Sequence, residues 1–259
     1  MEPIGHDKER RCDFTRIRHI CKALHHQNHL PEPKEKASSF GFFFHGGGFC
    51  VETPFSSNYH NYSNFVAYQA QVVVVLTVHY RRAPEHPLPI AHEDSWAAVK
   101  WIASHLYGED WLNLHANLEK VFFAGDGAGA NLALHMVIRV GTEKLKGIKL
   151  QGIVLLHPFF RGVEVVGLEL AELEERAMAD QLWRFTCPTT TGSDDPIINP
   201  AKYQHLGSLD CGRVLILVAE KETFELLGSI SSKIYIYFFT FDTINFFFFT
   251  IITPNVTNR

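Results

Sequence analysis

Residues 120–140, KVFFAGDGAGANLALHMVIRV, decide the fold class of this protein. They begin with a short apolar run rich in aromatic residues and pass through a glycine-rich turn. Apolar positions then recur at three- and four-residue spacing up to Gly141, which is suited to a helix C-cap. The run predicts a buried strand and the spacing predicts an amphipathic helix. A strand that turns tightly into a helix indicates an α/β protein.

Similar apolar runs flank this stretch and repeat the pattern. Each is short, rich in β-branched or aromatic residues, and bounded by Gly, Pro or charge; they lie at 40–44, 72–80, 152–160 and 213–220. Residues 93–106 have the spacing of another helix. Because strands without polar alternation are buried on both faces, we expect a mostly parallel sheet with helices on both sides.

Composition narrows the class of protein further. The chain has 259 residues, 46% hydrophobic and 20% charged, with a formal net charge of −4. That balance disfavours a nucleic-acid or anionic-membrane partner. No CxxC pair and no apolar leader after Met1 are present, so we predict a cytoplasmic protein whose five cysteines are free thiols: Cys12, Cys21, Cys50, Cys187 and Cys211.

Three regions differ in character. Residues 1–39 form a polar lead-in without sustained periodicity, residues 40–228 carry the α/β pattern, and residues 229–259 are dense in Phe and Ile. The last segment approaches the length of a membrane helix, but Asp242 and Asn245 near its centre make insertion costly. We therefore interpret it as a β-prone tail and not as a membrane anchor.

Two glycine-rich motifs carry the chemistry. His45-Gly46-Gly47-Gly48-Phe49 follows the first core run, and consecutive glycines let backbone N–H groups converge on one oxygen, although a glycine run also forms ordinary turns. Gly125-Asp126-Gly127-Ala128-Gly129 lies between the predicted strand and helix. That context is typical of a nucleophile elbow.

With further blocks, these motifs resemble a known family. HGGGF, YRRAPEHPLPIAHEDSWAAVKW, GDGAGAN, LLHPFFRG, DDPIINP and VLILVAEKE follow one another between about residues 42 and 227. They resemble the plant carboxylesterases of the hormone-sensitive-lipase group of α/β-hydrolases, which also includes gibberellin receptors and 2-hydroxyisoflavanone dehydratases. The resemblance implies an α/β-hydrolase fold and hydrolysis of carboxylic esters.

The chain departs from this family at the nucleophile. Family members carry serine at the centre of GxSxG, where this sequence has Gly127. Glycine has no side chain to attack a carbonyl. It also relieves the backbone strain of an elbow, which costs a non-glycine residue about 1–3 kcal/mol. We therefore expect stability to be kept while the chemistry is lost.

The other two triad positions differ as well. The resemblance places the acid at Glu222, where the family usually has Asp, and a glutamate can serve that role in some α/β-hydrolases. It places a histidine about thirty residues later, but no histidine follows His205. Because the chain order of this fold is nucleophile, acid, histidine, the general base is also predicted to be missing. The strand–helix unit that carries it is predicted to be missing or replaced.

The resemblance leaves the binding residues in place. Gly47, Gly48 and the N–H of Ala128 match the family's oxyanion hole, with His45 and Gly46 in supporting positions. A small-molecule ester or carboxylate is therefore a candidate ligand. No cofactor is implied, and the histidines lack metal-ligand spacing.

Other candidates have weaker support. Asp126 as a substitute nucleophile would need an elbow shifted by one residue, so a structural role is favoured. His157 is interpreted as a packing or loop-orienting residue, and the block from Arg81 to His86 as a structural turn. Four aromatic residues are candidate pocket walls, although core packing is the favoured interpretation of each: Phe49, Phe159, Phe160 and Trp183.

Three hypotheses for function remain. The first is a carboxylesterase-like α/β-hydrolase with impaired catalysis. The second is a non-catalytic binder, which resembles the gibberellin receptors but has HGGG where they have HGGS. The third is a degenerate family member whose C-terminal unit has been replaced by an unrelated, Phe-rich segment.

Overall fold

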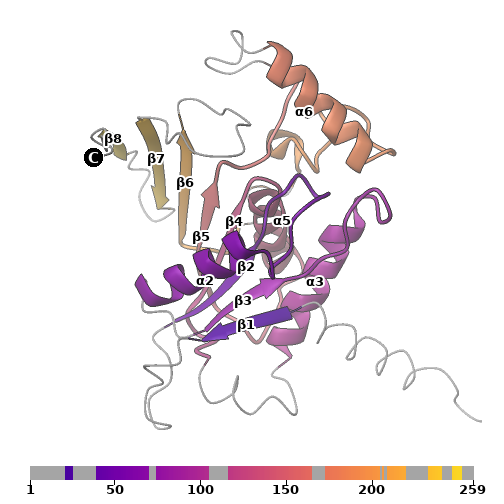
Figure 1. Cartoon of the computed structure of the whole chain (residues 1–259). Helices are drawn as coiled ribbons and strands as arrows, with labels where there is room; N and C mark the ends of the chain where they lie inside the picture. Colours follow the sequence, from indigo (N-terminus) through magenta and orange to yellow (C-terminus); the bar gives the residue numbers. More distant parts are fainter. Residues whose placement is uncertain are drawn as a thin grey trace, which may run out of the picture.

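A computed structural model describes residues 21–25, 39–69, 74–104, 116–164, 173–204, 206, 209–219, 233–240 and 247–252. These residues build one eight-stranded sheet with the strand order β1-β3-β2-β4-β5-β6-β7-β8 (Figure 1). The strands are β1 (Cys21–His25), β2 (Phe40–Phe44), β3 (Val74–Val78), β4 (Val121–Asp126), β5 (Leu150–Leu156), β6 (Arg213–Ala219), β7 (Lys233–Thr240) and β8 (Phe247–Ile252).

The five central strands, β3, β2, β4, β5 and β6, run parallel to one another. Strand β1 is antiparallel to β3 at one edge, while β7 and β8 continue the other edge in antiparallel fashion. The α/β fold with a mostly parallel central sheet is therefore confirmed. The order reverses around β2, because the chain passes from β2 to β3 on one side and then to β4 on the other.

This reversal determines where a ligand can bind. In open α/β sheets, ligands bind beyond the carboxyl ends of the strands at the point where strand order reverses. Phe44 at the end of β2 pairs with Gly125 near the end of β4. The two glycine motifs follow these neighbouring strand ends, so the fold places them side by side.

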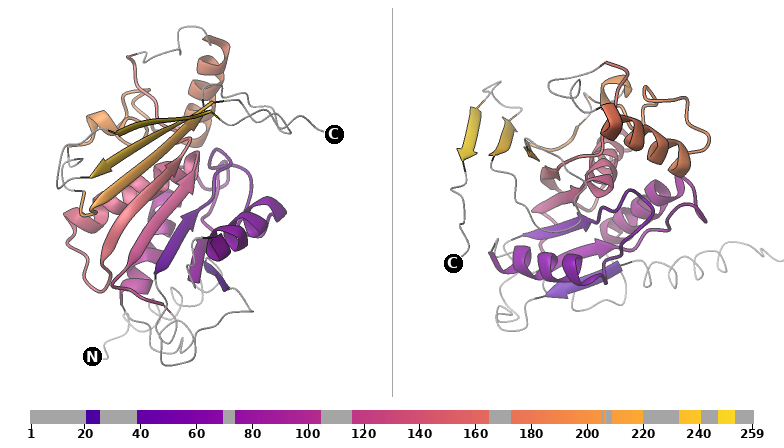
Figure 2. Two further views of the ribbon diagram at one scale, coloured as in Figure 1. Left: turned by 90° about the vertical axis from the view of Figure 1, so that its left-hand side faces the viewer. Right: turned by 45° about the horizontal axis from the view of Figure 1, so that its top comes forward.

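Helices cover both faces of the sheet. Figure 2 shows α2 (Ser57–Gln69) on one face, and α3 (Ile90–Ala103) and α5 (Ala128–Thr142) on the other. Helix α6 (Leu173–Thr186) lies beyond the carboxyl edge of the central strands, and a short 3₁₀ helix spans Pro200–Lys202 (Figure 1). None of the helices in the described part of the chain reaches the length and hydropathy needed to cross a bilayer.

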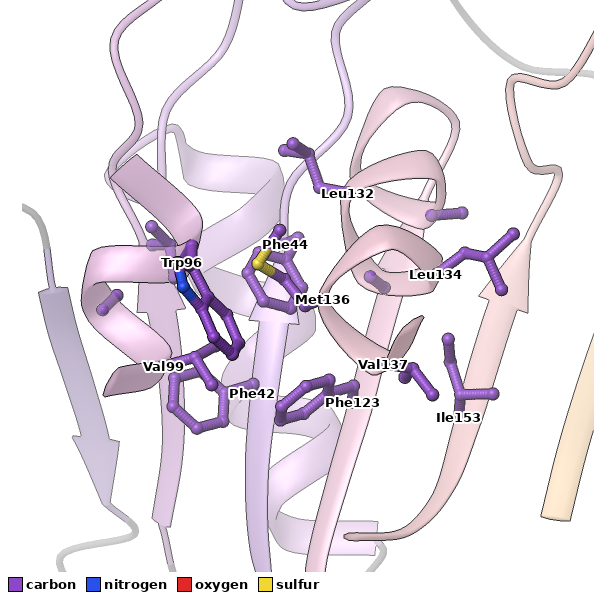
Figure 3. Packing of buried hydrophobic residues seen from close by; sticks show 14 of the residues in the cluster. Phe42, Phe44, Trp96, Val99, Phe123, Leu132, Leu134, Met136, Val137 and Ile153 are labelled. Carbon is purple, nitrogen blue, oxygen red and sulfur yellow. The ribbon is translucent and has the colours of Figure 1, made fainter. Parts of the chain in front are cut away.

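The main core lies between the sheet and the pair α3 and α5. Figure 3 shows Phe42 and Phe44 of β2 against Phe123 of β4, with Trp96 and Met136 packed on them from the helices. The rings of Phe42 and Phe123 meet edge to face with centroids 5.1 Å apart. Alternate positions of β4 are fully buried on this side, which anchors the strand that leads into the elbow.

Two parts of the sheet lie outside the region that carries the α/β pattern in the sequence. Strand β1 lies in the lead-in, where no alternation predicted a strand. In the described part of the Phe-rich tail, β7 and β8 are antiparallel strands. These strands agree with a β-prone tail, because neither described segment is helical. The replacement of the usual C-terminal strand–helix unit stays a prediction.

Candidate active site

The turn between β4 and α5 has the backbone of a nucleophile elbow. Gly127 has φ 50° and ψ −115°, a conformation that L-residues rarely adopt. Its N–H donates to the Leu156 carbonyl at 2.9 Å, and its carbonyl accepts from the Phe159 N–H at 2.9 Å. These bonds tie the elbow to the end of β5 and to the segment that follows it.

The glycines on either side of Gly127 allow the close approach of strand and helix. A Cβ on Gly125 would collide with the backbone of Gly129, and a Cβ on Gly129 would collide with the carbonyl oxygen of Phe44. A Cβ on Gly127 would meet no atom within 4 Å. The elbow therefore presents open space at the position where the family carries its nucleophile.

The loop after β2 is held in left-handed conformations. Gly47 has φ 93°, Gly48 has φ 58° and Phe49 has φ 61°. The Gly47 carbonyl accepts from the N–H groups of Cys50 and Val51, at 3.0 and 2.9 Å. Phe49 is not a glycine, so its positive φ strains the backbone. Its fully buried ring holds the residue in this conformation by packing against the ring of Phe159, with the ring centroids 6.3 Å apart.

The backbone N–H groups of Gly47, Gly48 and Ala128 are the candidate donors of the site. Within the described part of the chain, no hydrogen bond links any of the three to a protein acceptor. Ala128 is also the first residue of the 15-residue helix α5, whose N-terminus carries partial positive charge. Unpaired donors at neighbouring strand ends are the arrangement that stabilises a carbonyl oxygen acquiring negative charge.

His45 lies behind this loop. Its side chain is fully buried, its Nδ1–H donates to the Gly46 carbonyl at 2.9 Å, and its ring stacks on Tyr80 with centroids 4.2 Å apart. Burial lowers the pKa of His45 to about 3, so the imidazole is neutral at pH 7. A neutral, buried ring suits a loop-orienting residue and does not suit a proton acceptor open to substrate.

Asp126 also points behind the loop. Its Oδ2 accepts a 2.6 Å hydrogen bond from the Tyr59 hydroxyl. Burial raises the pKa of this carboxyl, while the bonds from Tyr59 and the Gly46 backbone oppose the rise. Asp126 is the last residue of β4, and the elbow conformation belongs to the next residue. The geometry thus favours a structural Asp126 over a substitute nucleophile.

The remaining candidate residues lie partly in the hydrophobic core and partly at its edge. Phe49 and Trp183 are almost fully buried in the core cluster, whereas Phe159 and Phe160 are half-buried against it. His157 follows β5 with φ 41°, and its N–H donates to the Leu217 carbonyl at 2.8 Å. Of the four candidate pocket walls, two are therefore core residues.

The acid position lies beyond the described residues. Glu222 follows β6, which ends at Ala219, and His205 is also outside the described part. In the printed sequence no histidine follows His205. The described site thus contains the elbow and the glycine loop but neither of the other triad positions.

Two tyrosines at the site were not predicted from the sequence. The Tyr80 hydroxyl donates to the carbonyls of His45 and Gly46, at 2.8 and 3.1 Å. Its position two residues beyond β3, at the same edge of the sheet as the glycine motifs, could have indicated it. Tyr59 lies on α2, for which no motif or period gave a signal.

A buried polar cluster braces the opposite side of the elbow. Asn131 Oδ1 pairs with His92 Nε2 at 3.0 Å, and its amide donates to the Ile197 carbonyl at 2.7 Å. His135 Nε2 also bonds that carbonyl, at 2.9 Å. Helix α5 therefore holds both the elbow and the loop that precedes Pro200.

Comparison with known proteins identifies the family to which the chain belongs. Residues 41–228 match the profile of a family described as alpha/beta hydrolase fold, so the chain belongs to that family. It is 45% identical over 199 residues to probable carboxylesterase 1 of Arabidopsis thaliana, covering 74% of this chain and 61% of that protein.

Other relatives agree. The chain is 38% identical over 213 residues to 2-hydroxyisoflavanone dehydratase of Glycine max, covering 78% of this chain and 64% of that one. The resemblance to plant carboxylesterases is thus confirmed. The thermostable carboxylesterase EstE1 shares the fold, with a TM-score of 0.55 at 23% identity over 78% of this chain and 74% of that chain. The chain spans about three fifths of the length of the curated relatives it matches.

Proposed function

We propose that this chain is a carboxylesterase-like α/β-hydrolase that keeps the carbonyl-oxygen site and is impaired in ester hydrolysis. The observation that carries the proposal is Gly127, which holds the elbow conformation without a side chain to attack an ester. In related hydrolases, loss of one triad member typically costs several orders of magnitude in rate. The site that remains is the pair of glycine motifs.

Hydrolysis of p-nitrophenyl acetate tests the impairment. The expected turnover is no higher than that of a heat-denatured sample of the same chain. Turnover that a serine-directed phosphonate abolishes would contradict the proposal, because it would identify a serine nucleophile elsewhere in the chain.

The variant Gly127→Ser tests whether the general base is missing as well as the nucleophile. We expect no rescue of turnover, since no histidine follows Glu222 in this sequence to take the serine proton. Rescue by this single change would show that another residue of the chain serves as base.

A second candidate function is non-catalytic binding of a small carbonyl compound or carboxylate. It is favoured by the N–H groups of Gly47, Gly48 and Ala128, which have no hydrogen-bond acceptor among the described residues, and by the open space at Gly127. Titration with benzoate, followed by NMR of the backbone amides, should shift these three resonances in a saturable way. Equal shifts with benzyl alcohol, which lacks the carboxylate, would argue against an oxyanion site.

A further inference from the structure

The candidate oxyanion site is assembled from two separate segments. Gly47 and Gly48 belong to the loop after β2, whereas Ala128 belongs to the turn after β4. An oxyanion is stabilised only when each donor lies about 2.7–3.1 Å from the same oxygen position. The pairing of β2 with β4 brings the two segments together, and groups that contact both segments fix the finer distance between their donors.

The Tyr59 hydroxyl makes such a double contact. It accepts a hydrogen bond from the Gly46 N–H at 3.0 Å and donates one to Asp126 Oδ2 at 2.6 Å. Gly46 directly precedes the loop donors, and only Gly127 separates Asp126 from Ala128. The Tyr59 oxygen thus joins the two halves of the site, in addition to the Gly46 backbone bond to Asp126 and the pairing of β2 with β4.

The bridge is tightly enclosed. A Cβ on Gly46 would lie 2.7 Å from Asp126 Oδ2 and 2.9 Å from the Tyr59 oxygen, so the glycine backbone rests directly on the bridge. The Tyr59 ring packs beside Phe43 and His45, with centroids 6.1 and 5.6 Å away. Burial, then the nearby Asp126, raise the pKa of Tyr59, so its hydroxyl keeps the proton that it donates.

Neighbouring tyrosines do not make this connection. The two carbonyls that accept from the Tyr80 hydroxyl, those of His45 and Gly46, both belong to the loop. Tyr62 lies one helical turn after Tyr59 and packs on Phe43 at 5.3 Å, and within the described chain its hydroxyl forms no hydrogen bond. Tyr62 is therefore a matched control on the same helix.

We infer that Tyr59 is the positioning residue that sets the oxyanion site, by bridging the Gly46 N–H and the Asp126 carboxylate. The inference rests on the proposed function, because it assumes that Gly47, Gly48 and Ala128 bind a carbonyl oxygen. It predicts that loss of the hydroxyl weakens stabilisation of an oxyanion while a side chain at position 127 stays accessible.

The variant Gly127→Cys supplies a reporter for this test. The added side chain enters open space, and a thiol reacts without a neighbouring histidine because part of it is thiolate at pH 7. With p-nitrophenyl acetate, the thiolate attacks the carbonyl carbon, a C–S bond forms, and the bond to p-nitrophenolate breaks after an oxyanion has developed. With iodoacetamide, the thiolate displaces iodide from carbon and no oxyanion forms.

The ratio of acylation rate to alkylation rate therefore measures the oxyanion site and cancels changes in thiol accessibility or pKa. Mass spectrometry of the peptide containing residue 127 excludes signal from the other cysteines. In this background, Tyr59→Phe should lower the ratio by about 10- to 100-fold, as expected for donors displaced by a fraction of an ångström to about 1 Å. Tyr62→Phe should leave the ratio within about twofold.

The outcomes separate the two proposals. If acylation and alkylation fall together in Tyr59→Phe, Tyr59 only supports the fold and the inference is wrong. If the ratio in Gly127→Cys alone equals that of the same chain unfolded in urea, the oxyanion site itself is absent and the proposed function fails. Should Tyr59→Phe not fold, Asp126→Asn must lower the ratio at least threefold, because it removes the charge from the bridge; an unchanged ratio would overturn the inference.

Discussion

Replacement of Gly127 by serine tests whether the elbow is strained independently of any chemistry. At φ 50° and ψ −115° a non-glycine residue costs about 1–3 kcal/mol. No atom lies within 4 Å of the added Cβ, so no collision adds to this cost. Serine also lowers the conformational entropy of the unfolded chain, which stabilises the folded state by about 0.4–1 kcal/mol. The expected net loss in the free energy of unfolding is therefore about 1–2 kcal/mol.

Urea unfolding followed by tryptophan fluorescence measures this loss. Gly129→Ser is the matched control, because its Cβ would collide with the Phe44 carbonyl and relief would require moving the helix from the strand. We expect the control to lose more than about 4 kcal/mol or to misfold. A neutral or stabilising Gly127→Ser would show that the turn is relaxed. A loss as large as that of the control would show that the space beside Gly127 is not open.

Two further predictions concern the scaffold. Asp94→Ala should lower the free energy of unfolding by about 2–3 kcal/mol, since Asp94 is 5% exposed and accepts three hydrogen bonds from Arg81. Glu93→Ala is the control, because this neighbouring side chain is 59% exposed and its loss should cost less than about 0.5 kcal/mol. Equal losses for the two variants in chemical denaturation would contradict a stabilising role for the Arg81–Asp94 pair. Burial lowers the pKa of His92 to about 3, so the ring is neutral in the folded protein but protonates below pH 6.5 when unfolded. The contribution of neutral His92 to the free energy of unfolding is fully present above pH 6.5 and should fall by about 2 kcal/mol by pH 5. His92→Gln should therefore lose about 2 kcal/mol less than the parent chain between these pH values. An unchanged dependence of the free energy of unfolding on pH would refute this prediction.

Much of the fold could be predicted because local patterns and tertiary structure agree. The run at residues 40–44 coincides with β2, since both its ends carry breaks in apolar character. The helix after the elbow begins directly after Gly127, as the sequence indicates, but it continues through Gly141 to Thr142, and Glu143 is its C-cap. Strand β1 could not be predicted, because its pairing with β3 comes from a partner about fifty residues away and not from its own pattern.

The candidate site was predictable only in part, for a related reason. The glycine loop and the elbow carry their signals in consecutive residues. The role of Tyr59 depends instead on a hydrogen bond to Asp126, 67 positions away in sequence, which exists only once α2 has packed against β1 and β3. Glu222 was placed by resemblance alone and stays a prediction.

The two glycines that flank Gly127 have a consequence for how this protein tolerates change. The shape of the turn is enforced by Gly125 and Gly129, which admit no side chain, and not by the residue at its apex. Many substitutions at position 127 should therefore be accepted by the fold, while almost none should be accepted two positions to either side. A lineage with this backbone can lose or regain a reactive residue without rebuilding the scaffold, so its activity is evolutionarily far more labile than its architecture.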